Sequence, residues 1–246
     1  MPSGEPPPTA LEPLPEDWTR ALAIVAHPDD MEYGAASAVA RWTAQGKDVR
    51  YVLVTKGEAG IASRPPVEVA PLRELEQRTS AAIVGVAVVE FLDHRDGLVQ
   101  PGLELRRDLA RAIRAHRPEV IVSINFRGSW GPGSWNHVDH RVVGEAVLDA
   151  ARDAANPWLF PELRDDGLEP FATRFVAFGG SPVPSHFVDV SDWIDTGVSS
   201  LRAHATYLAG LGDGGGDPDA FLRGAAQAAG AMVGVRYATT FEVVWV

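Results

Sequence analysis

Short apolar segments alternate with segments of helical periodicity along most of this chain, and this alternation limits its fold more than any other feature of the sequence. Residues 21–26 (ALAIVA) are continuously apolar, which is typical of a strand buried on both faces. In residues 35–45, which follow, the apolar side chains recur at helical spacing. Because this strand–helix order repeats, it favours parallel strands joined by right-handed crossovers.

We therefore expect an α/β protein, a Rossmann-like three-layer sandwich whose mostly parallel sheet carries helices on both faces. The expected strands cover residues 21–26, 49–54, 87–92, 120–124, 174–178, 186–190 and 241–246. The expected helices cover residues 35–45, 72–83, 103–115, 138–155, about 192–208, and 220–229. Two segments rich in glycine and proline, 55–71 and 210–219, are expected to lack regular structure.

The first sixteen residues differ in composition from the rest of the chain. They are acidic and rich in proline, which predicts an extended tail or a strap over the surface, and they lack the basic and apolar parts of a signal peptide. From residue 17 to 246 no repeat or shift in composition marks a boundary, so we expect a single domain there. No uncharged apolar run approaches the roughly 18–20 residues that span a bilayer, and we expect a cytoplasmic protein.

Charge and cysteine content narrow the classes of partner and of site. The chain has 22 Lys and Arg against 33 Asp and Glu, a formal net charge of −11. Such a surface repels nucleic acid and anionic membranes, so neither is expected as a partner. The chain has no cysteine, which excludes disulfides, cysteine-bound zinc, iron–sulfur clusters and a thiol nucleophile. Any metal ion must therefore be held by histidines and carboxylates.

One group of polar residues follows the first expected strand directly. In open parallel sheets, ligands bind outside the carboxyl ends of the strands, and this position is occupied here by His27-Pro28-Asp29-Asp30. One of the two aspartates could simply cap the helix that follows. Capping does not account for the second aspartate and His27 together, and the group therefore indicates a metal site.

A second polar group, Asn136-His137-Val138-Asp139-His140, opens the helix after the fourth expected strand. His137 and His140 are three residues apart and would lie on one face of that helix. A lone pair of this kind is common on surfaces, but here it lies at the same expected edge of the sheet as His27. Two imidazoles and one carboxylate with an open position are typical of catalytic zinc, although the same ligands suit Fe(II).

Five segments, AHPDD, TKGEAG, RELEQRTSAAIVGV, FLDHRDG and NHVDH, together resemble the LmbE-like (PIG-L) de-N-acetylase family. The resemblance implies a zinc-dependent N-deacetylase that acts on a small N-acetylated amino-sugar substrate. The zinc ligands that it implies are His27, Asp30 and His140. It further implies Asp29 as the general base, His137 as the group that polarises the carbonyl, and Asp139 as the partner that orients His137.

The resemblance also implies that Glu58, Arg73 and Asp96 surround the substrate. From the sequence alone, Arg73 and Glu76 could equally form an exposed helical ion pair. Two tryptophans in the glycine-rich loop before His137, Trp130 and Trp135, are expected to form an apolar wall for the substrate or, alternatively, to pack the loop onto the core.

Two segments depart from the family pattern. The chain has HATY at 204–207 where many relatives have HxSQ, and YATT at 237–240 where many have a YAE-like motif. Both departures leave the zinc ligands intact and put the outer pocket, and hence the substrate, in doubt.

Other functions remain open at this point. The runner-up is a zinc amidase acting on another N-acyl or thiol-conjugate substrate of secondary metabolism. A non-catalytic metal- or sugar-binding homologue, an Fe(II) oxygenase and an NAD enzyme are less favoured, the last because no GxGxxG follows the first strand. The sequence does not decide between a monomer and a homo-oligomer.

Overall fold

A single sheet of eight strands runs through the protein, in the order β1-β7-β8-β6-β5-β2-β3-β4. The computed structural model describes residues 10–212 and 217–246. Strand β8 is antiparallel to both of its neighbours, and the other paired strands are parallel, so the expected mostly parallel sheet is confirmed. The strands are β1 (Glu12–Pro13), β2 (Arg20–Val25), β3 (Asp48–Leu53), β4 (Val89–Phe91), β5 (Val120–Ile124), β6 (Phe175–Gly179), β7 (His186–Asp189) and β8 (Ala238–Trp245).

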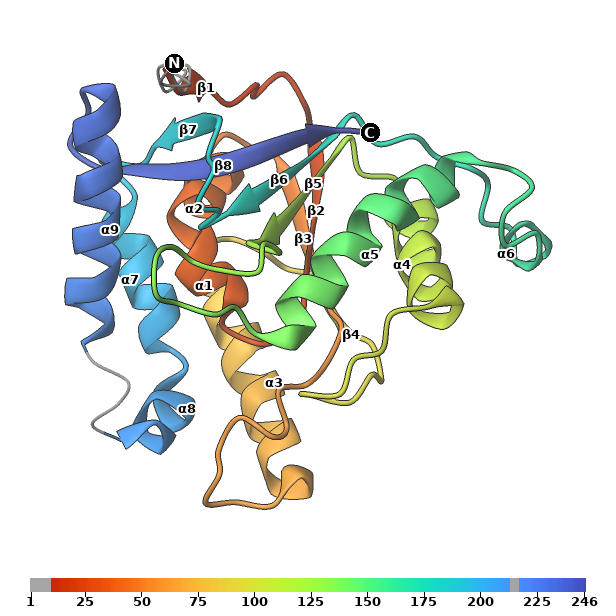
Figure 1. The fold of residues 1–246 in the computed structure, drawn as a ribbon, viewed down its shortest axis with the longest axis horizontal. Helices are drawn as coiled ribbons and strands as arrows, with labels where there is room; N and C mark the ends of the chain where they lie inside the picture. Colours follow the sequence, from red (N-terminus) through yellow and green to blue (C-terminus); the bar gives the residue numbers. More distant parts are fainter. Residues whose placement is uncertain (1–9, 213–216) are drawn as a thin grey trace, which may run out of the picture.

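Helices cover both faces of the sheet and complete three layers (Figure 1). Helices α4 and α5 lie on one face, and α1, α2, α3, α7 and α9 lie on the other. The helices are α1 (Asp30–Gly34), α2 (Ala36–Ala44), α3 (Pro66–Ile83), α4 (Leu103–His116), α5 (Val138–Ala155), α6 (Glu162–Asp165), α7 (Ile194–Arg202), α8 (Ala205–Gly210) and α9 (Pro218–Val233).

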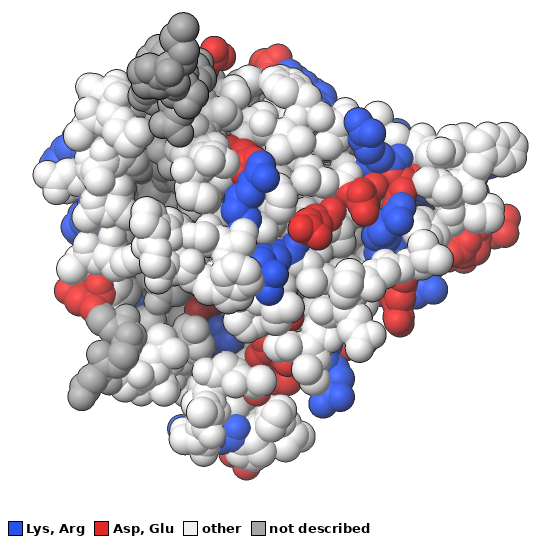
Figure 2. Space-filling model, in the orientation of Figure 1, with Lys and Arg blue, Asp and Glu red and all other residues white. Residues whose placement is uncertain are grey.

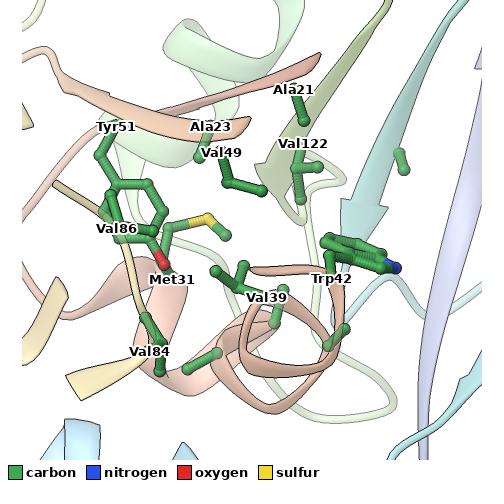
Figure 3. Close-up of a cluster of buried hydrophobic side chains, with 14 of the residues drawn as sticks. Ala21, Ala23, Met31, Val39, Trp42, Val49, Tyr51, Val84, Val86 and Val122 are labelled. Carbon is green, nitrogen blue, oxygen red and sulfur yellow. The ribbon is translucent and has the colours of Figure 1, made fainter. Parts of the chain in front are cut away.

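Strand β2 supplies side chains to the core on both sides of the sheet. Leu22 and Ile24 belong to the apolar cluster beneath α4 and α5, while Ala21 and Ala23 belong to the cluster beneath α1 and α2. Figure 3 shows this second cluster, in which Trp42 and other large side chains fill the space over the small alanines. Because both faces of β2 are buried, its sequence from Ala21 onward is continuously apolar, and the end of this apolar run marks the end of the strand.

The largest differences from the expected elements concern α3 and the helix expected over about 192–208; smaller ones are that α9 extends to Val233 and that β8 begins at Ala238. Helix α3 begins at Pro66, within the segment expected to be irregular, because proline is tolerated in the first helical turn. Pro71 lies further inside, where it removes one backbone hydrogen bond while the helix continues. The helix expected over about 192–208 is divided into α7 and α8, and the break places the side chain of His204 in the interior. Residues 213–216 of the expected glycine-rich turn lie outside the described residues.

The described part of the N-terminal segment lies along the sheet edge as a strap. Strand β1 pairs with β7, and the side chain of Leu14 is buried. The carboxylate of Glu16 accepts hydrogen bonds from Arg41 and Trp42 of α2. The first nine residues lie outside the described part, and the domain boundary after residue 16 stays a prediction. Among the helices of the described residues, none has both the length and the apolar character needed to cross a membrane.

Candidate active site

The first polar group forms a tight turn between β2 and α1, at the carboxyl end of the strand (Figure 1). Asp29 is the N-cap of α1 and has a left-handed backbone, with φ of 84°, which a non-glycine residue adopts only when its surroundings hold it. Its N–H donates to Oε1 of Gln77 at 2.9 Å, and the Gln77 amide donates to Glu32 at 3.0 Å. The backbone N–H of His27 donates to Asp30 at 2.9 Å, which closes the turn.

The second polar group begins helix α5, after the loop that leaves β5. Nδ1 of His140 lies 2.9 Å from Oδ1 of Asn136. A neutral ring that donates from Nδ1 leaves the lone pair of Nε2 free to bind a metal ion. The Asn136 amide is itself fixed, because it donates to the carbonyl oxygens of Asn125 and Arg127 at 2.7 and 2.9 Å. The orientation of His140 is therefore set by the loop that precedes it.

The two groups converge on one position. Nε2 of His140 lies 3.1 Å from Nδ1 of His27 and 3.0 Å from Oδ1 of Asp30, and His27 Nδ1 lies 3.6 Å from Oδ2 of Asp30. Ligands at zinc bond lengths in a tetrahedral site are separated by about 3.3–3.4 Å. The donor set therefore fits a small cation, and His137 also has a ring nitrogen within 4.8 Å of those of His27 and His140.

On its opposite side, the ring of His27 is held by two carboxylates. Nε2 of His27 lies 3.2 Å from Asp96 and 3.2 Å from Asp139, and these three residues form a second candidate group for a cation. We interpret the contact as a carboxylate–histidine pair, which fixes the ring of a metal ligand. Asp139 also accepts the backbone N–H groups of Gly97 and Val99, at 2.7 and 3.2 Å. The side chain of Asp139 thus supports His27, and not His137 as the resemblance implied.

His137 is oriented by the backbone. As the N-cap of α5, its Nδ1 accepts the N–H of Asp139 at 3.2 Å, which leaves the ring proton on Nε2. Burial lowers the pKa of His137, and the charge of His27 lowers it further. The ring is therefore neutral near pH 7 and offers a single N–H donor beside the converging ligands.

Asp29 is buried, and its carboxylate lies 3.3 Å from the guanidinium of Arg73. Burial raises the pKa of Asp29, and Arg73 opposes this rise. Within the described residues, Oδ2 of Asp29 has no hydrogen-bond partner. A carboxylate with a raised pKa and a free oxygen next to a candidate metal ligand has the properties of a general base.

Arg73 lies beneath the turn and is only 2% exposed. Its guanidinium donates to the carbonyl oxygens of Pro28 and Gly57, at 2.6 and 3.1 Å, and no side chain larger than hydrogen fits at Gly57, whose Cβ would lie 2.1 Å from Arg73. Glu76, the proposed ion-pair partner, instead accepts the backbone N–H groups that begin α8. The alternative of an exposed helical pair is therefore wrong.

The other expected substrate contacts fall in different places. Asp96 lines the cleft above the site. Glu58 is not among the cleft residues in the described part of the chain, and its carboxylate accepts the N–H of Asp96 at 2.9 Å. Glu58 thus braces the loop that carries Asp96.

Above these polar groups opens a cleft of about 750 Å³. Its aromatic lining residues are Tyr33, Trp130, Tyr207 and Phe221. Trp130 lies in the wall, with its ring 5.9 Å from that of His140, as expected. Trp135 is not among the lining residues that the structure describes; it is 75% exposed and lies against the guanidinium of Arg141.

Comparison with known proteins agrees with this geometry. Residues 22–151 match the family described as PIG-L, GlcNAc-PI de-N-acetylase. The chain belongs to the PIG-L family. It is 30% identical to the diacetylchitobiose deacetylase of Thermococcus kodakarensis, over 76% of this chain and 70% of that protein. It is 28% identical to a probable N-acetyl-α-D-glucosaminyl L-malate deacetylase of Bacillus anthracis, over 76% of this chain and 81% of the relative.

A solved structure is similar over nearly the whole PIG-L chain. The N,N'-diacetylchitobiose deacetylase of Pyrococcus horikoshii superposes with a TM-score of 0.84 at 27% identity, covering 93% of this chain and 85% of that one. The PIG-L match contains the proposed metal ligands together with Asp29 and His137, whereas Tyr207 and Phe221 lie beyond its end.

Sequence reasoning missed the residues that hold the PIG-L site in place. Gln77 and Glu32 fix the backbone of Asp29, and the hydroxyl of Ser80 donates to the same Glu32 oxygen at 2.6 Å. His204 lies 3.6 Å from the other oxygen of Glu32. The only signal was a cluster of polar residues on helix faces that are otherwise apolar, and this signal does not reveal a role.

Proposed function

We propose that this PIG-L protein hydrolyses the N-acetyl amide of a small amino-sugar substrate with the help of a zinc ion. The observation that carries the proposal is the convergence of His27, Asp30 and His140 on one cation-sized position, beside the free carboxylate oxygen of Asp29. The names of the relatives support the substrate class, since they describe deacetylases of acetylated sugars. Ferrous iron would use the same ligands, and zinc is our assignment.

Zinc in this position would lower the pKa of a bound water to about 7 and polarise the acyl oxygen as a Lewis acid. Asp29 takes the proton of the attacking water at Oδ2, the oxygen for which the described residues provide no hydrogen-bond partner. As the C–N bond breaks, Asp29 returns that proton to the amine nitrogen, so that acetate and the free amine leave.

His137 and Arg73 complete the roles of the site. The Nε2–H of His137 donates to the acyl oxygen as negative charge develops on it, which contributes about 2.7–4 kcal/mol if it acts as a typical oxyanion donor. Arg73 holds the turn that carries Asp29 and limits the rise in the pKa of the base.

Release of acetate from N-acetylglucosaminides tests the proposal. The purified protein is stripped with a chelator, and activity is measured before and after adding back Zn²⁺ or Fe²⁺. We expect turnover to disappear with the metal and to return with Zn²⁺. Recovery with Fe²⁺ alone would reassign the ion. Hydrolysis of other N-acyl amines, with no acetate from acetylated sugars, would establish an amidase instead.

A further inference from the structure

One wall of the cleft is aromatic, and two of its three rings come from helices that supply none of the proposed catalytic groups or metal ligands. Tyr33 lies on α1, Tyr207 on α8 and Phe221 on α9. The rings of Tyr33 and Phe221 meet edge to face, with centroids 5.7 Å apart, and Phe221 is 58% exposed. A largely exposed phenylalanine ring that packs on a half-buried tyrosine beside an active site indicates a ligand surface, because burying such a ring is favourable.

The wall starts on the side of the base. The ring of Tyr207 covers the guanidinium of Arg73 at 3.9 Å, and Arg73 in turn lies 3.3 Å from Asp29. Burial raises the pKa of Tyr207, and the neighbouring Asp29 carboxylate raises it further, so the phenol keeps its proton. Because Asp29 delivers the proton to the departing nitrogen, the wall faces the amine half of the substrate, which carries the sugar and its aglycone.

The charges around the cleft disfavour an anionic group at this wall. Arg73 is the only lysine or arginine among the described lining residues, and its guanidinium is already committed to Pro28, Gly57 and Asp29. In Figure 2, charged side chains of both signs lie over α4 and α5, whereas the surface around the loop from β5 to α5 is mostly uncharged. A carboxylate or phosphate at this wall would lie near the Asp29 carboxylate, and the described lining residues offer no lysine or arginine that is not already engaged.

We propose that Tyr33, Tyr207 and Phe221 form a subsite for an uncharged apolar aglycone, such as an aryl group, on the acetylated amino sugar. This inference rests on the proposed function for the position of the amine. Such a substrate differs from those in the names of the two relatives, which are a free disaccharide and a malate glycoside.

The test compares phenyl and methyl N-acetylglucosaminides of the same anomer. Burial of a phenyl-sized group corresponds to about a 10- to 100-fold gain in kcat/KM over the methyl glycoside. Phe221→Ala should collapse this ratio toward one, mainly through KM. Met232→Ala, on an exposed position of the same helix outside the described cleft lining, should leave the ratio as in the unaltered protein. Equal values for both glycosides, or a ratio that Phe221→Ala does not change, would overturn the subsite.

Binding of the deacetylated phenyl and methyl glucosaminides, measured by calorimetry, separates the subsite from the reaction. If no acetate is released but the phenyl amine binds more tightly and Phe221→Ala removes the difference, the reaction is wrong and the subsite stands. A 4-carboxyphenyl glycoside should bind at least about tenfold more weakly than the phenyl glycoside, a loss of about 1.4 kcal/mol. Equal or tighter binding of the carboxylate would overturn the assignment of an uncharged group.

Discussion

The floor and the aromatic wall of the cleft are built in opposite ways. On the floor, buried polar groups hold one another: Asp139 supports His27, Asn136 supports His140, and Gln77 supports Asp29. In the wall, Phe221 is largely exposed, and its ring packs edge to face with that of Tyr33. Chemistry requires groups fixed to fractions of an ångström, whereas apolar recognition tolerates looser surroundings. Variants of the floor should therefore change kcat and metal content, and variants of the wall should change KM.

The largest effect is expected for His140→Ala. Losing one of three proposed ligands should leave the protein without metal and without measurable turnover. Elemental analysis beside an acetate-release assay measures both. His116→Ala, at the far end of α4, serves as the control and should retain metal and activity. A His140→Ala protein that keeps its metal would break the ligand assignment.

Asp29→Asn should separate the base from the ligands. The metal should stay near its original stoichiometry while kcat falls by about 10²–10⁴-fold, because an amide cannot accept the proton of water. The same two assays apply. Loss of metal equal to that of His140→Ala would make Asp29 a ligand and not the base.

Gln77→Leu should have an intermediate effect. Without the acceptor for its N–H, the strained backbone of Asp29 is free to relax, and a displacement of the base costs about 10- to 100-fold in kcat with KM and metal content unchanged. The double variant Glu32→Gln with Gln77→Glu exchanges the two side-chain types. The carboxylate at position 77 can accept the N–H of Asp29, and the amide at position 32 can donate to that carboxylate, so this variant should recover most of kcat. A lower unfolding temperature with normal kcat in Gln77→Leu would show a role in folding only.

The smallest effect is expected for Trp135→Ala. The side chain is exposed and lies outside the described lining, so KM should stay within about twofold of its original value, which is the range of ordinary surface substitutions. Trp130 lines the cleft, and Trp130→Ala should therefore raise KM clearly more than Trp135→Ala does. Initial-rate kinetics on one acetylated glucosaminide measure KM for both variants. Equal changes in KM would show that the boundary of the cleft does not lie between Trp130 and Trp135.

The fold was predictable where burial on both faces of the sheet left a simple pattern. Strand β2 is apolar from Ala21 to Val25, and β5 is apolar except at Ser123, because helices cover both faces of these strands. The prolines at 65, 66 and 71 hid the start of α3, although a proline is tolerated in the first helical turn. The break between α7 and α8 was not predictable, because it depends on a tertiary contact. Glu76 on α3 accepts the N–H groups at the start of α8, and neither segment alone carries that information.

The site also has parts that the sequence predicted and parts that it did not. The sequence predicted that His27 and the pair His137 and His140 lie at one edge of the sheet, because both polar groups come after strands whose carboxyl ends meet there. The choice of Asp30 as the carboxylate ligand came from the family resemblance. Asp139 was expected beside His137, its near neighbour in sequence, but its side chain turns to His27 across the site. The role of Gln77 could not be predicted, since a glutamine on a helix is ordinary until the partner of its amide is known.

Strand β8 has a consequence for how the protein is made. It is formed by residues 238–245 and lies inside the sheet, between β6 and β7, so β7 and β1 have no contact with the rest of the sheet through backbone hydrogen bonds until it is in place. During synthesis on the ribosome, the half of the sheet that starts at β2 can assemble early, while the other edge must wait until residues 238–245 emerge. A shortened chain that ends before residue 238 would present the open side of β6 to other nascent chains, which makes it a candidate for aggregation.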